Sequence, residues 1–146
     1  MTHEDFMLVA IDEAKKGRGK VAPNPMVGCV IVEDGVIVAR GYHEVFGGLH
    51  AERNALIALG RKPLQGSIMY VTLEPCSTEG KTDACTDRII GAKIATLVVG
   101  AIDPNPDHRG YGLTILKTNG IEVIKGILTK ECEDLNSNFN QRMNAN

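Results

Sequence analysis

Apolar runs of strand length alternate with helical stretches in the second half of the chain. Residues 67–73 form a strand-like run, residues 86–92 show helical periodicity, and residues 94–100 form a second strand-like run. Two strands joined through a helix need a crossover connection, and such a connection favours parallel pairing within one sheet. The chain is therefore expected to fold around a sheet that contains parallel strands, with at least one helix packed on it.

A β-hairpin is predicted earlier in the chain. The runs 27–32 and 35–40 flank Asp34-Gly35, a dipeptide that favours a tight turn between antiparallel strands. Periodicity predicts further helices at 6–16, 50–59, 112–119 and 129–142, and a last strand at 121–125. Together these elements predict an α/β fold, a three-layer α/β/α sandwich with a five-stranded mixed sheet. The length of 146 residues fits one domain that spans residues 1–146.

Four side chains suggest zinc chemistry. His50 and Glu52 form an H-x-E motif, Cys76 follows Pro75, and eight residues separate Cys76 from Cys85. The signature of zinc-dependent deaminases is H-x-E followed by P-C-x-x-C, so the first half fits and the cysteine separation is longer. A catalytic zinc ion takes three protein ligands and leaves a fourth position for water. We therefore predict that His50, Cys76 and Cys85 bind zinc and that Glu52 carries protons.

The places of these residues relative to the predicted elements support this interpretation. Cys76 follows a strand-like run, Cys85 precedes a helical stretch, and His50 begins another. A helix N-terminus lowers the pKa of a thiol and favours the thiolate that zinc requires. Each residue type also has a purely structural reading, because cysteines are commonly small buried apolar residues and acidic residues are common in the first turn of a helix. Cys29 and Cys132, which lie in a strand-like and a helical run, are predicted to be structural.

Further motifs occur in order along most of the chain. They are Pro23-Asn24-Pro25-Met26-Val27-Gly28-Cys29-Val30, Gly41-Tyr42-His43, Gly47-Gly48-Leu49-His50-Ala51-Glu52, Tyr70-Val71-Thr72-Leu73-Glu74-Pro75-Cys76, Gly80-Lys81-Thr82 and Asp103-Pro104-Asn105-Pro106. In these motifs the chain, from Phe6 to about Phe139, resembles the deaminase domain of the riboflavin-biosynthesis deaminase/reductase family, which has a cytidine deaminase-like fold. That family has the same separation between its two zinc cysteines.

The resemblance implies a reaction and a set of site residues. The implied reaction is hydrolytic removal of the 2-amino group from 2,5-diamino-6-(5-phosphoribosylamino)pyrimidin-4(3H)-one, which releases ammonia. The residues at the family's functional positions are the zinc ligands His50, Cys76 and Cys85, the general acid/base Glu52, the pyrimidine contacts Asn24 and His43, and Lys81, Thr82, Asp103 and Asn105 near the ribose and phosphate.

The chain departs from the family pattern in two places. Thr78, Asp83 and Ala84 stand where family members usually carry a histidine and two prolines, between the zinc cysteines. Family members also usually carry a nicotinamide-dependent reductase domain after the deaminase, whereas this chain ends at Asn146. We expect either a monofunctional deaminase whose product is reduced by a separate polypeptide, or a deaminase domain taken from a longer chain.

Composition limits the class of partner. The formal net charge is −2 and there is no tryptophan, which argues against a nucleic-acid-binding surface. The chain has no apolar run long enough to span a bilayer and no signal-peptide pattern, so a cytoplasmic protein without a membrane partner is predicted. The expected partner is a small molecule, the pyrimidine ribosylamino phosphate. A homodimer or larger homo-oligomer is also expected, because a partner often covers the edge strands of a small open sheet.

Two other functions stay open at this stage. A deaminase of cytidine, guanine or a tRNA adenosine would share the zinc site but would not need the residues near a sugar phosphate. A non-catalytic zinc or pyrimidine-phosphate binding protein is the second alternative. A structural zinc usually has four protein ligands, and no fourth cysteine or histidine is placed to close this site, although the sequence alone leaves Cys29 open as a ligand. Turn chemistry alone also accounts for the Asp, Asn and Pro residues at 23–25 and 103–106.

Overall fold

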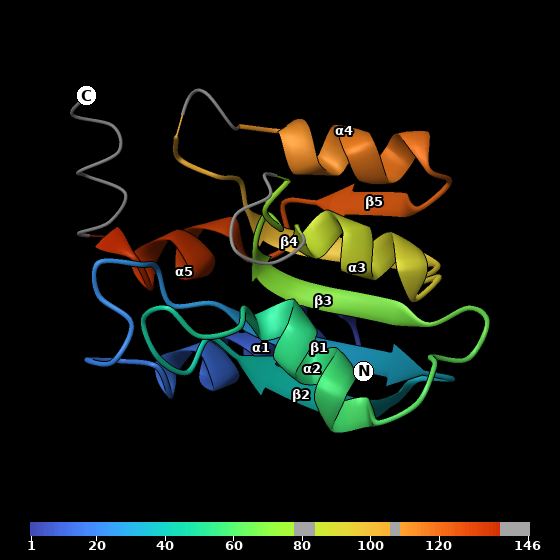
Figure 1. Ribbon diagram of the computed structural model, residues 1–146, viewed down its shortest axis with the longest axis horizontal. Coiled ribbons are helices and arrows are strands. Elements are labelled where there is room, and N and C mark those ends of the chain that lie inside the picture. Colours follow the sequence, from blue (N-terminus) through green and yellow to red (C-terminus); the bar gives the residue numbers. More distant parts are fainter. Residues whose placement is uncertain (78–83, 106–108, 138–146) are drawn as a thin grey trace.

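Five strands form one mixed sheet at the centre of the molecule. The computed structural model describes residues 1–77, 84–105 and 109–137. The strand order is β2-β1-β3-β4-β5, in which β1 pairs antiparallel with β2 and β3, while β3–β4 and β4–β5 are parallel (Figure 1). The strands are β1 (Gly28–Glu33), β2 (Val36–Tyr42), β3 (Ile68–Leu73), β4 (Thr96–Ala101) and β5 (Glu122–Lys125).

Helices cover both faces of this sheet, so the predicted three-layer α/β/α sandwich is confirmed (Figure 1). Side chains of α2, α3 and α4 pack in one apolar core, which includes Ala55, Ile89 and Leu116. Side chains of α1 and α5, including Met7 and Cys132, pack in a second core on the opposite face. The helices are α1 (His3–Lys15), α2 (Ala51–Leu59), α3 (Cys85–Gly91), α4 (Tyr111–Thr118) and α5 (Thr129–Asp134).

The hairpin and the first helix follow from local sequence chemistry. Asp34 and Gly35 both have positive φ, 50° and 76°, as the tight turn between β1 and β2 requires. The Thr2 hydroxyl accepts a hydrogen bond from the Asp5 backbone N–H at 3.2 Å, and the Asp5 carboxylate accepts one from the Thr2 N–H at 2.9 Å. This capping box starts α1 at His3, three residues before the predicted start.

Predicted boundaries elsewhere in the chain also differ from the structure. The strand predicted to start at residue 94 starts at Thr96, because Lys93 has a left-handed φ of 59° that turns the chain after α3. The last helix was expected to reach Arg142, but α5 ends at Asp134. A turn follows at residues 135–136, and the Asn136 side chain hydrogen-bonds the Met26 backbone. Residues 138–146 lie outside the described part of the chain.

Glycines let two helices lie directly on the sheet. A Cβ on Gly28 in β1 would collide with the Ala10 backbone of α1, and a Cβ on Gly41 in β2 would collide with the Ala55 backbone of α2. Because Gly41 lacks this atom, α2 lies close to β2, and the packing fixes the position of the helix that begins after His50. None of the helices in the described ranges is long and apolar enough to cross a bilayer.

Candidate metal centre and cavity

Three metal-donor side chains meet near the carboxyl end of the central strand β3. His50 is the N-cap of α2, Cys76 lies in the loop after β3, and Cys85 is the first residue of α3. His50 Nδ1 lies 3.3 Å from Cys85 Sγ and 3.6 Å from Cys76 Sγ. All three donor atoms lie within 4.8 Å of one another, and no other residue joins them within the described ranges. The structure therefore brings together the three predicted ligands.

The environment of the two thiols favours a thiolate at this cluster. The Cys85 backbone N–H, at the start of α3, donates to Cys76 Sγ at 3.2 Å. Hydrogen bonds from the Cys85 side chain, from His50 and from this N–H lower the pKa of Cys76 to about 4. The same thiol pairing, together with burial, raises the pKa of Cys85. Cys76 is therefore the more acidic thiol of the pair.

The donor set fits zinc. Two cysteine sulfurs and one histidine nitrogen are ligands that zinc prefers, and three protein ligands are the number found at catalytic sites, where the fourth position is open. Cys29, the alternative fourth ligand, lies fully buried in β1 and is not a member of the cluster. Cys132 lies buried on α5, on the other face of the sheet, so both of these cysteines have the structural positions predicted for them.

Glu52 places a carboxylate beside this cluster without joining it. It lies in the first turn of α2, two residues after His50, and its residue is only 3% exposed. Burial, with a smaller contribution from the nearby Cys76, raises the pKa of Glu52 to about 7, against the opposing effects of its own backbone N–H, of His50 and of a hydrogen bond from Cys85. A carboxylate with a pKa near 7 can both take up and release a proton near neutral pH.

A cavity of about 230 Å³ opens onto the cluster. Six of its lining residues come from the predicted site, and they derive from five separate segments of the chain: Asn24, His43, His50, Glu52, Cys76 and Asp103. Asp103 follows β4. Asn105 is not a lining residue, but its backbone N–H donates to Asp103 Oδ1 at 2.9 Å. Lys81 and Thr82, and the departures Thr78 and Asp83, lie outside the described residues.

Two histidines and an asparagine are linked in this wall. His43 Nδ1 lies 3.0 Å from the Leu49 carbonyl oxygen, which can only accept, so this nitrogen carries the hydrogen. The other ring nitrogen, Nε2, lies 3.3 Å from Asn24 Nδ2 and accepts from that amide in the neutral ring. The His43 ring also packs edge-on against His50, with centroids 5.4 Å apart. His43 therefore holds both Asn24 and the histidine donor in position.

Glu74 is a cavity residue for which sequence patterns predicted no role. It follows β3 directly and precedes the zinc-type Pro75-Cys76 pair, which was the available signal for a functional position. It is 7% exposed and lines the cavity together with the donor residues. Pro25, Val27 and Leu73 complete the lining and supply its apolar surface.

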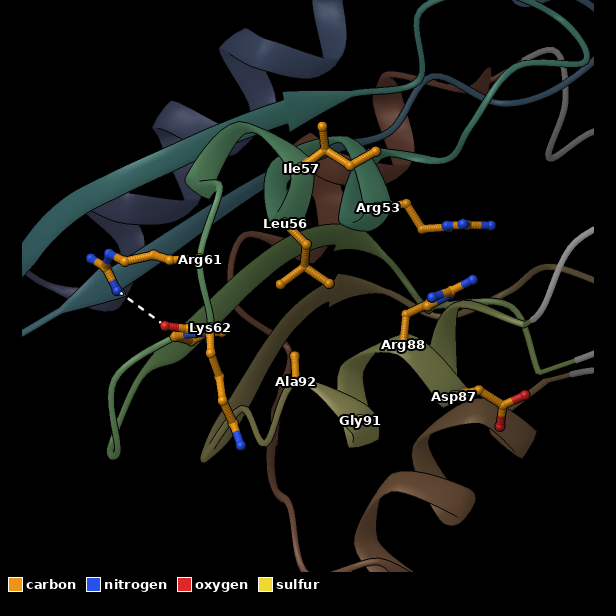
Figure 2. Close-up of a pocket in the computed structure, with 10 residues that line it drawn as sticks. Arg53, Leu56, Ile57, Arg61, Lys62, Asp87, Arg88, Gly91 and Ala92 are labelled. Atoms are coloured by element: carbon orange, nitrogen blue, oxygen red, sulfur yellow. Dashed lines mark hydrogen bonds between the residues drawn. The ribbon is translucent and has the colours of Figure 1, made fainter.

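A second cavity, of about 530 Å³, lies between α2 and α3 away from the metal donors. Figure 2 shows Arg53 on α2 and Arg88 on α3 extending toward the same side of it, with Leu56 and Ala92 between the helices. Arg61, at the other end, donates to the Lys62 carbonyl oxygen at 3.2 Å (Figure 2). The lining of this second cavity contains neither cysteine nor histidine. The larger cavity therefore lacks the metal-donor side chains that line the smaller one.

Known proteins are similar to this chain in both sequence and fold. Residues 1–101 match the family described as the cytidine and deoxycytidylate deaminase zinc-binding region. The chain is 48% identical over 138 residues to the diaminohydroxyphosphoribosylamino-pyrimidine deaminase of Buchnera aphidicola subsp. Acyrthosiphon pisum, covering 94% of this chain and 93% of that protein. It is 47% identical to riboflavin biosynthesis protein RibD of Escherichia coli (strain K12), covering 98% of this chain and 39% of RibD.

A solved structure agrees with these relatives. The diaminohydroxyphosphoribosylaminopyrimidine deaminase/5-amino-6-(5-phosphoribosylamino)uracil reductase of Thermotoga maritima superposes with a TM-score of 0.92 at 47% identity, covering 98% of this chain and 41% of that one. The chain thus spans about two fifths of the RibD-type proteins and nearly the whole Buchnera deaminase. By sequence, fold and donor set, the chain belongs to the zinc-dependent cytidine and deoxycytidylate deaminase family, in its riboflavin-biosynthesis deaminase branch.

Proposed function

We propose that this chain removes the 2-amino group of 2,5-diamino-6-(5-phosphoribosylamino)pyrimidin-4(3H)-one by hydrolysis, a step of riboflavin biosynthesis that releases ammonia. One observation carries the proposal. A buried carboxylate with a pKa of about 7, Glu52, stands beside a three-donor metal cluster in a cavity of small-molecule type. The similarity to the diaminohydroxyphosphoribosylamino-pyrimidine deaminase of Buchnera supports the substrate.

His50, Cys76 and Cys85 would hold the metal. Zinc bound there would supply a water molecule acidic enough to act as a nucleophile near neutral pH. Glu52 takes a proton from the attacking water and gives it to the exocyclic nitrogen that leaves as ammonia. Assisted proton transfers of this kind are worth roughly 10²–10⁴-fold each. Burial supports this role, because it keeps bulk water from competing for the proton.

The cavity walls would orient the substrate. We assign Asn24 and His43 to the pyrimidine ring, since their amide and imidazole are linked to each other and lie beside the donor cluster. Asp103 and Asn105, joined by a hydrogen bond on the loop after β4, are assigned to the ribose and phosphate end. Lys81 and Thr82 are assigned to the same end by the family pattern.

A deaminase acting on a different base is the second candidate. The loop between the zinc cysteines departs from the family pattern, and Ala84, its last residue, caps α3 without a side-chain hydrogen bond. Cytidine, guanine and tRNA adenosine are the alternative substrates. A purely structural zinc site has less support, because the cluster has three protein donors within the described residues and a structural site usually has four.

We also propose the setting of the reaction. The chain would act as a single deaminase domain in the cytoplasm, as a homodimer or larger homo-oligomer. A nicotinamide-dependent reductase would consume its product, either as a separate polypeptide or as a further domain. The pairing of the two activities in the Thermotoga maritima protein supports this order of reactions.

Ammonia release tests the proposal. The zinc-loaded protein is assayed with the diaminopyrimidine ribosylamino phosphate, its dephosphorylated form, cytidine and guanine at equal concentrations. We expect turnover of the first compound, weaker turnover of the second, and none of the nucleoside and base. Preference for cytidine or guanine would favour the second candidate, and a zinc-containing protein that releases ammonia from none of them would contradict a deaminase function.

A further inference from the structure

Glu74 binds three backbone N–H groups from a distant part of the chain. Its Oε1 accepts from Asp103 at 3.1 Å and from Gly110 at 3.0 Å, and its Oε2 accepts from Gly112 at 2.9 Å. These donors lie 29, 36 and 38 residues further along the sequence. Hydrogen bonds to an ionised carboxylate are among the strong ones in proteins. One buried side chain thus ties the end of β3 to the loop after β4 and to the start of α4.

The start of α4 offers backbone N–H groups that need an acceptor such as Glu74. Gly110, the N-cap of α4, offers no side chain to cap the helix, so the N–H groups of the first turn need an acceptor from elsewhere. Glu74 is that acceptor, and the helix dipole favours a carboxylate at this end. A Cβ on Gly112 would collide with the Pro75 carbonyl oxygen, so only glycine lets α4 approach so closely.

The bonds continue to the residues assigned to the sugar phosphate. Asp103 donates its N–H to Glu74, and its own carboxylate accepts from the Asn105 N–H at 2.9 Å. Glu74 is also only two residues before Cys76. A short path of covalent and hydrogen bonds therefore connects the Cys76 loop with the Asp103–Asn105 turn.

Glu74 and Glu52 differ although both carboxylates line the cavity. Both oxygens of Glu74 already accept backbone hydrogen bonds, from the loop after β4 and from the start of α4. Among the described residues, neither ion pair includes Glu74, so backbone N–H groups and the α4 dipole compensate its charge. This arrangement suits a residue that holds others in place and does not suit a proton carrier.

We propose that Glu74 is a positioning residue that sets how well the site recognises the substrate's sugar phosphate. It holds the Asp103–Asn105 turn at a fixed position relative to the Cys76 loop, so that one end of the substrate is fixed when the other reaches the metal cluster. The identity of the substrate rests on the proposed function. The role of Glu74 in fixing the loop stands on the hydrogen bonds alone.

The kinetic test compares Glu74→Gln with Glu33→Gln on the phosphorylated and the dephosphorylated substrate. Glu33 is an equally buried glutamate that also accepts a backbone N–H, but it lies at the far end of β1. Glutamine keeps the size of Glu74 but loses its charge and turns an NH₂ group toward an N–H donor. We expect KM for the phosphorylated substrate to rise about 10- to 100-fold, the range for hydrogen bonds to charged groups, with little change for the dephosphorylated one.

Each other kinetic outcome has a definite meaning. A fall in kcat on both substrates with unchanged KM would place Glu74 at the reacting atoms and overturn the proposal. An equal loss on both substrates that follows the fraction of folded protein, as expected for Glu33→Gln, would reduce Glu74 to a structural residue. If Glu74→Gln does not fold, Gly112→Ala disturbs the same contact from the α4 side, and the same rise in KM is expected.

Hydrogen exchange tests the proposal without any substrate. The amides of Asp103, Gly110 and Gly112 should exchange at least tenfold faster in Glu74→Gln than in the wild-type protein, and Glu33→Gln should leave them unchanged. Unchanged exchange at all three amides in Glu74→Gln would overturn the proposal. Faster exchange in a protein whose wild type does not deaminate the diaminopyrimidine would sink the proposed function and leave the positioning role intact.

Discussion

Two buried glutamates, Glu33 at the end of β1 and Glu52 in the first turn of α2, have opposite environments. Glu52 is 3% exposed and Glu33 is 6% exposed. Glu33 accepts from two Arg61 nitrogens at 2.6 and 2.9 Å and from the Leu64 N–H at 2.8 Å, and the Arg61 pairing lowers its pKa. Burial raises the pKa of Glu52 to about 7, and neither ion pair of the described residues includes it. The available partners, more than the burial, separate a stabilising carboxylate from a reactive one.

The fold keeps these two kinds of carboxylate apart. β1 runs from Gly28, which follows the cavity residue Val27, to Glu33, and α2 runs from its first turn, which holds Glu52, to Leu59, shortly before Arg61. Each element therefore has one end that serves the cavity and one end that is tied down by an ion pair. Substitutions at the two ends should separate loss of chemistry from loss of stability.

Removing a metal donor should have the largest effect. Cys85→Ala is expected to lose bound zinc and to lower ammonia release at least 100-fold, because the nucleophile depends on the metal. The matched control is Cys132→Ala, which removes an equally buried thiol from α5 on the other face of the sheet. It should keep one zinc per chain and most of the activity, at some cost in stability. Atomic absorption measures the zinc content of both variants, and an ammonia assay measures their activity. A fully active Cys85→Ala protein that keeps its zinc would refute the ligand assignment.

Displacing α2 from the sheet should lower both the stability of the fold and the activity of the site. Gly41→Ala would press a methyl group against the Ala55 backbone and cost about 1–3 kcal/mol of stability, the usual range for overpacking. Activity should fall as well, because α2 carries His50 and Glu52. Gly91→Ala is the control, since a Cβ there meets nothing within 4 Å and its φ is ordinary. Urea denaturation should show it unchanged or stabilised by up to about 1 kcal/mol. A neutral Gly41→Ala would show that the packing of α2 is looser than described.

The smallest expected effect comes from the Glu33–Arg61 ion pair, and it is seen in how the free energy of unfolding depends on pH. The pKa of Glu33 is lower in the folded chain than its ordinary value of 4.5, so its ionised form stabilises the fold at pH values above 4.5. That stabilisation disappears as the pH falls through the lower pKa of the folded state. Arg61→Met should therefore flatten the fall in unfolding free energy between pH 5 and pH 3, measured by urea titration at each pH. Identical slopes in the two proteins would show that the pair is not linked to stability.

Sequence patterns predicted the local elements and the donor residues, and the reasons are physical. Asp34-Gly35 encodes its turn in two residues, and the ends of neighbouring strands and helices bring His50, Cys76 and Cys85 together once the layers are known. The links made by Glu74, and the bonds from Asn136 to the Met26 backbone 110 residues away, depend on which segments the fold places side by side. No local periodicity encodes such pairs, which is also why the end of α5 was placed too late.

The most direct test of the account compares Glu52→Gln with Glu33→Gln in zinc-loaded protein. Zinc content, unfolding free energy and ammonia release from the phosphorylated diaminopyrimidine are measured for both. We predict that Glu52→Gln keeps its zinc and fold but loses about 10²–10⁴-fold in kcat or more, whereas Glu33→Gln keeps kcat and loses stability. Substantial turnover by zinc-loaded Glu52→Gln would contradict the claim that the buried carboxylate of Glu52 carries the protons of the reaction.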